Sequence, residues 1–339
     1  MKIILIKIGI FILNIIYFFI KLFPINKNKV TFISRQSNEV SLDFTMIAKE
    51  LKQQNENIKI VFLCKKLGTS FSEKVKYCFH MVKQMYNIAT SKVVILDSYC
   101  IPVCVLKQKK KLVVIQIWHA LGSLKKFGYS SLDKKDGRNS KLAKAMKMHR
   151  NYTYILTSSN LSKKFFKEAF NARDEQMLVM NLPRVDFLKS EKEQEKMRIR
   201  FVGVYPETNN KKQNILYCPT NRKGQKIPIE NIVKDIPLDK YNFIAKLHDG
   251  TEVIYVKGKK IEKTSNFTGM ELLHVADYII TDYSAIVYEA AITQKPIYFY
   301  TYDYEEYQIN RGTYIDYMSE MPGPICKDFK EIMKMIEEN

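Results

Sequence analysis

The stretch KLVVIQIWHALGSLKKFG, Lys111 to Gly128, decides the fold of this chain. It opens with a continuous β-branched apolar run, as expected for a strand that is buried on both faces of a parallel sheet. The run ends at Trp118, the only tryptophan, and His119, and a glycine-containing turn and two lysines follow. A strand that ends this way delivers a reactive side chain and backbone N–H groups to an anion. The stretch therefore predicts an anion site at the end of a buried strand.

Similar apolar runs alternate with helix-like segments along the rest of the chain. The alternation predicts a doubly wound α/β fold. A charged run and a polar loop interrupt it between residues 188 and 213, and we take this region as a domain boundary. The expected organisation is an apolar membrane-associating segment at 1–27 and α/β domains at 28–200 and 201–339. The two Rossmann-like domains are expected to face each other across a cleft, with ligands at the carboxyl ends of the strands.

The charge of the chain restricts its partners. Its 339 residues include 55 Lys and Arg against 35 Asp and Glu, a net charge of +20. Such an excess favours nucleic acid or an anionic membrane surface, or else belongs to a merely soluble basic protein. The lysines are scattered, and no known nucleic-acid-binding pattern is present, so we expect no nucleic-acid partner. The six cysteines form no C-x-x-C pair, which is typical of reduced thiols in a cytosolic protein.

The N-terminal segment is apolar from Ile3 to Phe23 and is closed by Pro24. No small-x-small site follows, which argues against a cleaved signal peptide. Three interpretations stay open: an interfacial helix, a spanning helix, and a helix packed on the domain. The interfacial helix fits best, because lysines lie near both ends and the uninterrupted apolar part is short.

Polar residues follow four of the apolar runs. Carboxyl ends of strands are where an open α/β sheet binds its ligand, so the four together indicate a site. These strand-end segments are His119, Pro219 to Arg222, His248, and Asp282 to Ala285.

Ser284 and Ala285 open the helix that carries Glu289. A hydroxyl and N–H groups at a helix start bind phosphate well. Equally, Ser284 is placed to cap its own helix. The local sequence does not separate these two interpretations.

Two of the five histidines end strands in different predicted domains. His119 is placed to act as a general base toward a hydroxyl, and His248, with Lys246 nearby, to stabilise phosphate charge. Lys125 and Lys126 either contact the anion or form a solvated turn. No metal-binding motif and no P-loop is present, so phosphoryl chemistry here would use Lys, Arg, His and helix N-termini.

Seven short motifs together resemble one family. They are WHALGSLKKFG, LPRVD, ILYCPTNR, KLH, ADYIITDYSAIVYEAA, KPIYFYTYDYEEY and RGTYIDYMSEMPGP. As a set, from about residue 28 onward, they look like the signatures of the CDP-glycerol:glycerophosphotransferases of teichoic acid and capsule synthesis. The form of the first motif and the apolar N-terminus look most like the glycerol-phosphate primases of that family.

The resemblance implies a GT-B fold on the cytoplasmic face of the cell membrane. It implies transfer of glycerol phosphate from CDP-glycerol to a polyprenyl-diphosphate-linked saccharide, with release of CMP and without a metal or other cofactor. By motif matching, His119 falls on the proposed base and His248 on a segment near the diphosphate. The implied substrate-binding residues are Ala120, Leu121, Gly122, Ser123, Lys125, Arg184, Pro219, Thr220, Lys246, Leu247, Ser284, Ala285 and Glu289.

Three positions depart from the family pattern. Ala285 replaces a second serine, Asp249 follows His248 in place of proline, and Asn221 stands where an aromatic residue often follows Pro-Thr. They mark either a different donor, such as CDP-ribitol, or ordinary drift. A CDP-ribitol-using or polymer-extending transferase is therefore the first alternative. A nucleic-acid-binding protein and a non-catalytic membrane scaffold are the remote ones.

Overall fold

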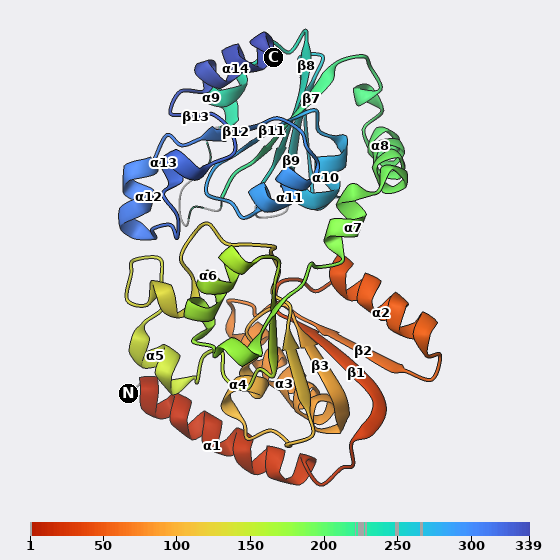
Figure 1. Ribbon diagram of the computed structural model, residues 1–339, viewed down its shortest axis with the longest axis vertical. Coiled ribbons are helices and arrows are strands. Elements are labelled where there is room, and N and C mark those ends of the chain that lie inside the picture. Colours follow the sequence, from red (N-terminus) through yellow and green to blue (C-terminus); the bar gives the residue numbers. More distant parts are fainter. Residues whose placement is uncertain (1, 221, 223–226, 228, 248–250, 265–266) are drawn as a thin grey trace. The chain divides into compact units, whose positions relative to one another are not determined.

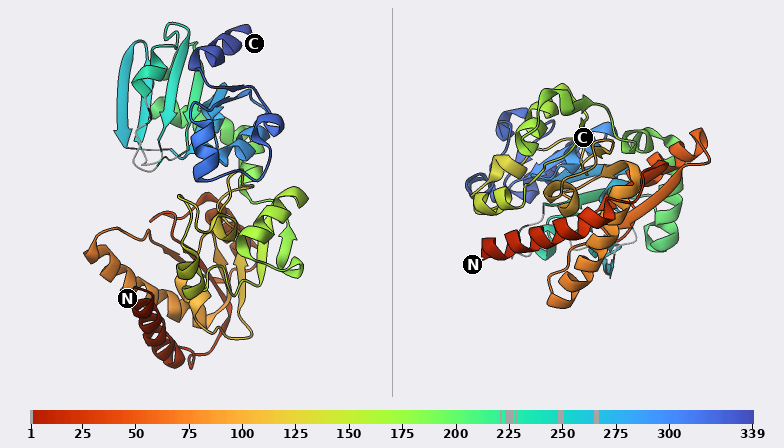
Figure 2. Two further views of the ribbon diagram at one scale, coloured as in Figure 1. Left: turned by 90° about the vertical axis from the view of Figure 1, so that its left-hand side faces the viewer. Right: turned by 90° about the horizontal axis from the view of Figure 1, so that it is seen from below.

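The computed structural model describes the chain except residues 1, 221, 223–226, 228, 248–250 and 265–266. The chain forms two compact units, Met1–Arg184 and Val185–Asn339. Each unit is an α/β layer structure around its own sheet (Figure 1; Figure 2).

Unit 1 is built on a six-stranded sheet in the order β2-β1-β3-β4-β5-β6. Every pair of neighbouring strands in it is parallel. All carboxyl ends therefore lie along one edge of the sheet, as predicted for this half of the chain. The strands are β1 (Asn26–Ser34), β2 (Lys59–Cys64), β3 (Ser91–Leu96), β4 (Val113–Gln116), β5 (Tyr154–Thr157) and β6 (Met177–Val179).

Helices connect these strands. Ser41 caps α2 through its side chain, and Ser70 forms a capping box with Glu73 at the start of α3. The helices of unit 1 are α1 (Lys2–Ile20), α2 (Leu42–Gln54), α3 (Phe71–Thr90), α4 (Ile101–Val105), α5 (Ser140–Ala145) and α6 (Asn160–Phe170), with 3-10 turns at Gly128–Ser131 and Asp174–Gln176.

Unit 2 carries a seven-stranded sheet in the order β10-β9-β8-β7-β11-β12-β13. Its strands are β7 (Gln213–Cys218), β8 (Tyr241–Lys246), β9 (Thr251–Val256), β10 (Lys259–Thr264), β11 (Tyr278–Thr281), β12 (Ile297–Tyr300) and β13 (Ile325–Cys326). Its helices are α7 (Arg184–Lys189), α8 (Glu191–Val204), α9 (Ile229–Val233), α10 (Gly269–Val275), α11 (Ile286–Ile292), α12 (Tyr304–Asn310), α13 (Tyr317–Glu320) and α14 (Phe329–Glu338), with a 3-10 turn at Pro206–Thr208.

The sheet of unit 2 is parallel from β8 to β13, but β9 and β10 form an antiparallel hairpin at its edge. Hydropathy alone indicates a weak strand at β9 and no strand at β10. β10 is the edge strand of the sheet and pairs only with β9. Its sequence, KKIEKT, has a single apolar residue, and charged side chains are common on edge strands. Backbone pairing with β9, and not burial, makes it a strand, and hydropathy patterns do not report such pairing.

The division between the units comes earlier in the chain than the predicted boundary at residue 200. Position 200 lies inside α8, which belongs to unit 2. The charged run that suggested a linker is the exposed face of this helix. Met197 and Phe201 are its buried face, and α8 contacts α10. Only two of its side chains, Met197 and Phe201, are buried, and the many charged residues around them hide this short apolar periodicity.

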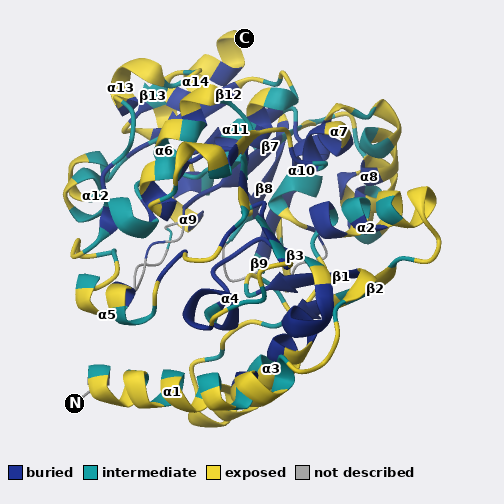
Figure 3. Cartoon of the chain, turned by 60° about the horizontal axis from the view of Figure 1, so that its bottom comes forward, coloured by how far each residue is buried: buried dark blue, intermediate teal, exposed yellow. Residues whose placement is uncertain are grey.

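Helix α1 lies along unit 1 and contacts α3 and α5. Among its described side chains the one fully buried large residue is Tyr17, which donates to Gln108 Oε1 at 2.6 Å. Most of its apolar side chains are exposed, among them Ile8, Phe11, Ile12 and Phe18 (Figure 3). By length and composition alone, Ile3–Ile20 qualifies as a candidate membrane span. The helix is therefore attached to the unit by a narrow contact and turns an apolar face outward.

Candidate active site at the strand ends

The strand that opens the motif at Lys111 ends at Gln116, two residues before Trp118. Trp118 has a positive φ of 58°, a left-handed conformation that L-residues rarely adopt. The buried Gln116 stabilises this turn, because its Oε1 accepts from Trp118 N at 2.9 Å and its Nε2 donates to Ser98 O at 3.1 Å. The indole stacks on Phe127 with ring centroids 5.0 Å apart. The turn fixes the backbone direction at His119.

The His119 ring is held by one of its nitrogens. Nδ1 lies 2.8 Å from the carbonyl oxygen of Asp97, which follows β3. Because a carbonyl oxygen only accepts, Nδ1 carries the proton and Nε2 carries the lone pair. The side chain is exposed. Gln36 Nε2 lies 3.2 Å from Nδ1, but an amide nitrogen only donates, so the shorter contact to the Asp97 carbonyl sets the position of the proton. This tautomer is the one that a general base requires.

Arg184 is buried and donates a hydrogen bond to the backbone of the same histidine. Its guanidinium donates to the buried carboxylate of Asp43 through Nε at 2.9 Å and Nη2 at 2.5 Å, and Nη1 donates to His119 O at 3.0 Å. At least three of its donors are thus committed within unit 1. These bonds let Arg184 position the His119 backbone, and the ligand contact that the resemblance implied stays a prediction.

The turn after His119 is mostly inside the unit. Leu121, Gly122 and Ser123 are buried, and Ala120 and Lys125 are half-buried. Ser123 Oγ donates to Lys125 O at 2.7 Å, and Ser158 Oγ donates to Leu121 O at 2.5 Å. The Ser123 hydroxyl therefore bonds its own turn in this conformation. Of the predicted residues that follow His119 in this turn, Ala120 and Lys125 reach the surface.

Asp97 is the buried acid of this edge. Burial raises the pKa of its carboxyl to about 6, opposed by hydrogen bonds from Ser34 and Ser98 and by the charge of Arg184. Four residues that position this site were not predicted from the sequence: Gln36, Asp43, Asp97 and Gln116. The one signal available was the polar Gln116 inside an otherwise apolar run. The others end or follow elements distant in sequence.

In unit 2, Asp282 joins the ends of two neighbouring strands. It follows β11, and both of its carboxylate oxygens accept from Thr220 N, at 2.8 and 3.0 Å, beyond the end of β7. Arg222 Nη1 donates to Asp282 Oδ2 at 2.7 Å and its Nη2 donates to Asp303 Oδ1 at 2.9 Å. The buried Tyr317 donates its hydroxyl to Asp282 O at 2.9 Å. This network holds Thr220 against Asp282, two residues before Ser284 in the chain.

The predicted phosphate segment of unit 2 lies at this edge. Ser284 and Ala285 are half-buried, and Glu289 is buried on α11. Ala285, and not Ser284, is the N-cap residue, and no side chain caps the helix. Ser284 Oγ approaches Ile286 N only at 3.5 Å. Ser284 is therefore not the cap of α11. Within the described chain, this long contact is the hydrogen bond that its hydroxyl makes.

The remaining predicted residues of unit 2 have differing environments. Lys246 Nζ lies 3.5 Å from the fully buried Glu252, and Leu247 is half-buried. Pro219 is buried, as is Thr220, whose Oγ1 has no hydrogen-bond partner in the described part of the chain. His248, the second predicted catalytic residue, lies outside the described residues, as do Asn221 and Asp249. Among the described residues, no group of three or more His, Cys, Asp or Glu side chains is arranged to hold a metal ion.

Comparison with known proteins identifies the family. The pattern of the CDP-glycerol:poly(glycerophosphate) glycerophosphotransferase family matches residues 15–339. A teichoic acid ribitol-phosphate primase of Bacillus spizizenii is 30% identical over 94% of this chain and 84% of its own. A teichoic acid glycerol-phosphate primase of Bacillus subtilis is 32% identical over 76% of this chain and 68% of its own. A teichoic acid poly(ribitol-phosphate) polymerase of Bacillus spizizenii is 30% identical, and the match covers 98% of this chain but 54% of the polymerase.

Solved structures agree on the fold. A histidine-to-asparagine variant of the wall teichoic acid polymerase TagF superposes with a TM-score of 0.73 at 18% identity, over 99% of this chain and 87% of TagF. The UDP-GlcNAc 2-epimerase of Methanocaldococcus jannaschii gives a TM-score of 0.56 at 14% identity, over 91% of this chain and 92% of the epimerase. These likenesses confirm the α/β fold with GT-B-like neighbours. With the family pattern over nearly its whole length, the chain belongs to the CDP-glycerol:poly(glycerophosphate) glycerophosphotransferase family of teichoic acid synthesis.

Proposed function

We propose that this chain transfers glycerol phosphate from CDP-glycerol to a hydroxyl of a polyprenyl-diphosphate-linked saccharide and releases CMP. The observation that carries the proposal is the His119 ring, whose Nδ1–H is bonded to Asp97 O and whose Nε2 is therefore the proton acceptor. The family membership supplies the reaction class. Unit 1 would take the acceptor and unit 2 the donor.

The reaction is an in-line displacement at the β-phosphorus of the donor. The acceptor hydroxyl oxygen forms a bond to this phosphorus while the bond to the bridging oxygen of CMP breaks. The hydroxyl proton passes to His119 Nε2, and the bond electrons leave with CMP. Negative charge grows on the phosphoryl oxygens and the leaving group. His248, Lys246, Ser284 and the N–H of Ala285 are proposed to offset it.

Each remaining substrate-binding residue has a proposed role at one of the two edges. The turn Ala120–Ser123 and Lys125 would line the acceptor side. Arg184 would fix the His119 backbone. Pro219 and Thr220 would contact the nucleotide, Leu247 would flank the diphosphate, and Glu289 would orient the donor alcohol. No metal or other cofactor enters this scheme, so transfer should persist in EDTA.

The acceptor carries a lipid tail, so the enzyme must work at a membrane. We propose that α1 binds the cytoplasmic face of the cell membrane as an interfacial helix. Its outward apolar side chains and the net charge of +20 support this location together.

A CDP-ribitol-using transferase is the second candidate. The relative that covers 94% of this chain is a ribitol-phosphate primase, and the glycerol-phosphate primase has similar identity over a shorter part. A polymer-extending enzyme with either donor fits the same family.

The test is a transfer assay with purified protein and a short-tailed disaccharide-diphosphate acceptor. CDP-glycerol and CDP-ribitol are supplied separately, and CMP release and product mass are measured. We expect one added glycerol phosphate, which His119→Ala abolishes and His80→Gln, a histidine change on α3, does not. A ladder of products would indicate a polymerase, and turnover with CDP-ribitol alone would change the donor. Absence of CMP with either donor, or full activity of His119→Ala, would refute the proposal.

A further inference from the structure

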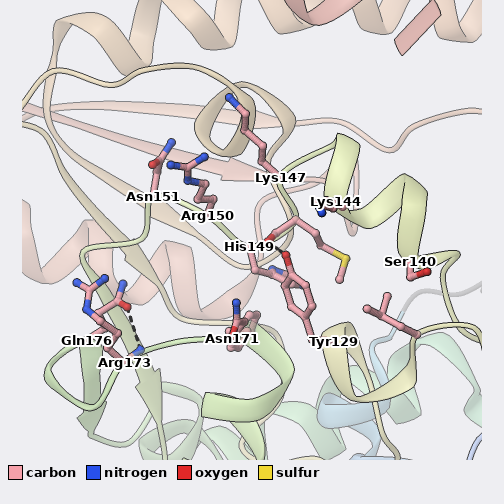
Figure 4. A pocket seen from close by; sticks show the side chains of 13 residues that line it. Tyr129, Ser140, Lys144, Lys147, His149, Arg150, Asn151, Asn171, Arg173 and Gln176 are labelled. Atoms are coloured by element: carbon pink, nitrogen blue, oxygen red, sulfur yellow. Dashed lines mark hydrogen bonds between the residues drawn. The ribbon is translucent and has the colours of Figure 1, made fainter. Parts of the chain in front are cut away.

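Unit 1 contains a cavity of about 550 Å³ that the proposed reaction does not use. It lies between α5, the segment 147–151 that precedes β5, and the C-terminal end of α6. Four cationic side chains, Lys144, Lys147, Arg150 and Arg173, line it around His149, and no Asp or Glu does (Figure 4). Its walls therefore attract an anion.

Two of these cations are available to a ligand. Lys144 and Arg150 are exposed and make no ion pair or side-chain hydrogen bond within the described part of the chain. The other two are already engaged, since Lys147 Nζ donates to Val105 O at 3.2 Å and Arg173 pairs with Glu175. Two of the four cations in the cavity wall are thus bonded to other protein groups, and the side chains of the other two are not bonded to the described part of the chain.

His149 forms the buried floor between them. Its Nδ1 lies 3.1 Å from the Tyr152 hydroxyl, and its ring meets Phe170 edge-on at 4.6 Å. Burial, with the charge of Arg138, lowers its pKa to about 3, so the imidazole is neutral at physiological pH. It therefore offers a hydrogen-bonding group to a ligand without repelling the lysines.

The backbone around the cavity is strained. Lys147, His149, Asn151 and Asn171 have positive φ values of 47°, 58°, 68° and 49°. Left-handed conformations are unfavourable for most L-residues, although Asn tolerates them, and they cluster at functional sites. Asn151 Nδ2 donates to Val103 O at 2.9 Å and to Leu106 O at 3.0 Å, which fixes the strained segment against α4. Lys147 and Asn171 end α5 and α6, where a left-handed residue is common. His149 and Asn151 cap no helix, and a binding role would account for their conformation.

The cavity adjoins the apolar N-terminal helix. Helix α5, which carries Lys144, contacts α1 and lies beside it near the N-terminus (Figure 1). The segment just after α4 also reaches the end of α1, because Lys21, the residue after the helix, donates through Nζ to Lys107 O at 2.9 Å. A group bound in the cavity would therefore lie near α1, whose other side is the exposed apolar face.

We propose that this cavity binds the phosphate or diphosphate group of a membrane lipid. A lysine and an arginine form charge-assisted hydrogen bonds to phosphate oxygens, and neutral His149 adds a further one. The lipid tail would continue along α1. Two lipids carry this chemistry, an anionic phospholipid and a polyprenyl diphosphate. The inference rests on the membrane location of α1 in the proposed function but is independent of the chemistry at His119.

Inorganic pyrophosphate is the first probe, titrated against the full-length protein in detergent. Trp118 is the sole tryptophan, and its ring lies 6.0 Å from that of His149, so its fluorescence reports on the cavity. We expect saturable binding that Lys144→Gln with Arg150→Gln weakens about tenfold or more. The matched control is Lys49→Gln with Lys92→Gln, which removes the same charge from exposed positions elsewhere in unit 1 and should bind as wild type. No saturable binding, or equal loss in both double variants, would overturn the proposal.

The second stage identifies the lipid. Geranyl diphosphate and dihexanoyl-phosphatidylglycerol are each tested as competitors of pyrophosphate, with dihexanoyl-phosphatidylcholine as the zwitterionic control. Competition by geranyl diphosphate alone assigns the acceptor lipid, and competition by phosphatidylglycerol assigns bulk phospholipid. Failure of both to compete would refute the lipid assignment. Binding is measured without donor or turnover, so its outcome is independent of whether the transfer assay succeeds.

Discussion

His119 depends on two other residues for its chemistry. The carbonyl of Asp97 selects its tautomer, and Arg184 Nη1 holds its carbonyl oxygen at 3.0 Å. Arg184 is in turn held by Asp43, which is buried at the start of α2. The three residues come from separate elements of unit 1. An exposed histidine is thus positioned by buried neighbours, and each neighbour can be tested separately from the base itself.

The Asp43–Arg184 pair should behave as a buried ion pair. Asp43→Asn leaves the guanidinium without its charge partner and is expected to lower the free energy of unfolding by about 3–5 kcal/mol. Asp43→Leu combined with Arg184→Met removes both charges and should restore most of that stability. Transfer by the double variant should stay low, because the His119 carbonyl has lost its donor. Urea unfolding and CMP release measure the two effects, and full activity of the double variant would exclude a positioning role for Arg184.

Asp97 should make stability depend on pH in an unusual direction. Its folded pKa of about 6 exceeds the ordinary value of 3.8, so the folded chain holds this proton more tightly than the unfolded chain. The resulting stabilisation is fully present below about pH 4 and is lost as the pH rises through 6, a difference of about 3 kcal/mol for two pKa units.

Asp97→Asn removes this titration and keeps the backbone carbonyl that bonds His119. Urea unfolding of wild type and variant at about pH 4 and about pH 7.5 gives the comparison. Relative to wild type, the variant should gain stability between the lower and the higher pH. An unchanged difference between the two proteins would show that the Asp97 carboxyl does not titrate in this range.

At the scale of elements, the strand ends and α1 have contrasting roles. In unit 2, Asp282 ties the end of β11 to the end of β7 through Thr220 N. The two proposed donor-binding segments therefore move together. Helix α1 is tied to the unit near its C-terminal end, where Tyr17 donates to Gln108, and its exposed stripe repeats at helical spacing on the side away from Tyr17. A membrane surface is the environment that would cover this stripe.

Replacing stripe residues should weaken membrane binding without unfolding the protein. Ile8 and Ile12 are each 50% exposed, so Ile8→Ser with Ile12→Ser costs little folding energy. It should reduce sedimentation with phosphatidylglycerol vesicles by about tenfold or more, since each isoleucine loses part of a transfer energy of about 1.5–3 kcal/mol. The control is Ile199→Ser with Ile309→Ser, two exposed isoleucines of unit 2. Equal loss in both double variants would assign the effect to general surface hydropathy.

At the scale of the whole molecule, the charge of +20 adds a long-range term to the short-range apolar contact of α1. The two terms differ in their response to salt. Electrostatic attraction is screened within about 10 Å at 0.1 M salt, whereas apolar burial is not weakened by salt. The anchoring mechanism can therefore be separated into its two parts.

Binding to vesicles of mixed phosphatidylglycerol and phosphatidylcholine should fall steeply between about 50 and about 500 mM NaCl and then level off. The plateau is the contribution of α1, and Ile8→Ser with Ile12→Ser should lower it. Binding to pure phosphatidylcholine vesicles should be weak and nearly independent of salt. Complete release at high salt would show that charge alone holds the protein at the surface.

The sequence by itself determined the α/β class, the polar residues at strand ends and the family. Each depends on local information: β-branched runs such as residues 111–117, a polar residue at their end, and short motifs. The same patterns placed His119 and Ser284 at strand ends. They also predicted the apolar α1, although its membrane location stays a prediction.

Only the tertiary structure decided which residues support the site. Asp43 and Arg184, or Thr220 and Asp282, are far apart in sequence, and nothing local reports their pairing. The unit boundary was mispredicted for a related reason, because α8 owes its place to packing on α10, which is distant in sequence. Hydropathy also does not reveal the β9–β10 hairpin, since β10 owes its place to backbone pairing. The cationic cavity around His149 likewise arises from three chain segments. Hydropathy records what each residue prefers, whereas the contacts that position a site depend on how the chain returns on itself.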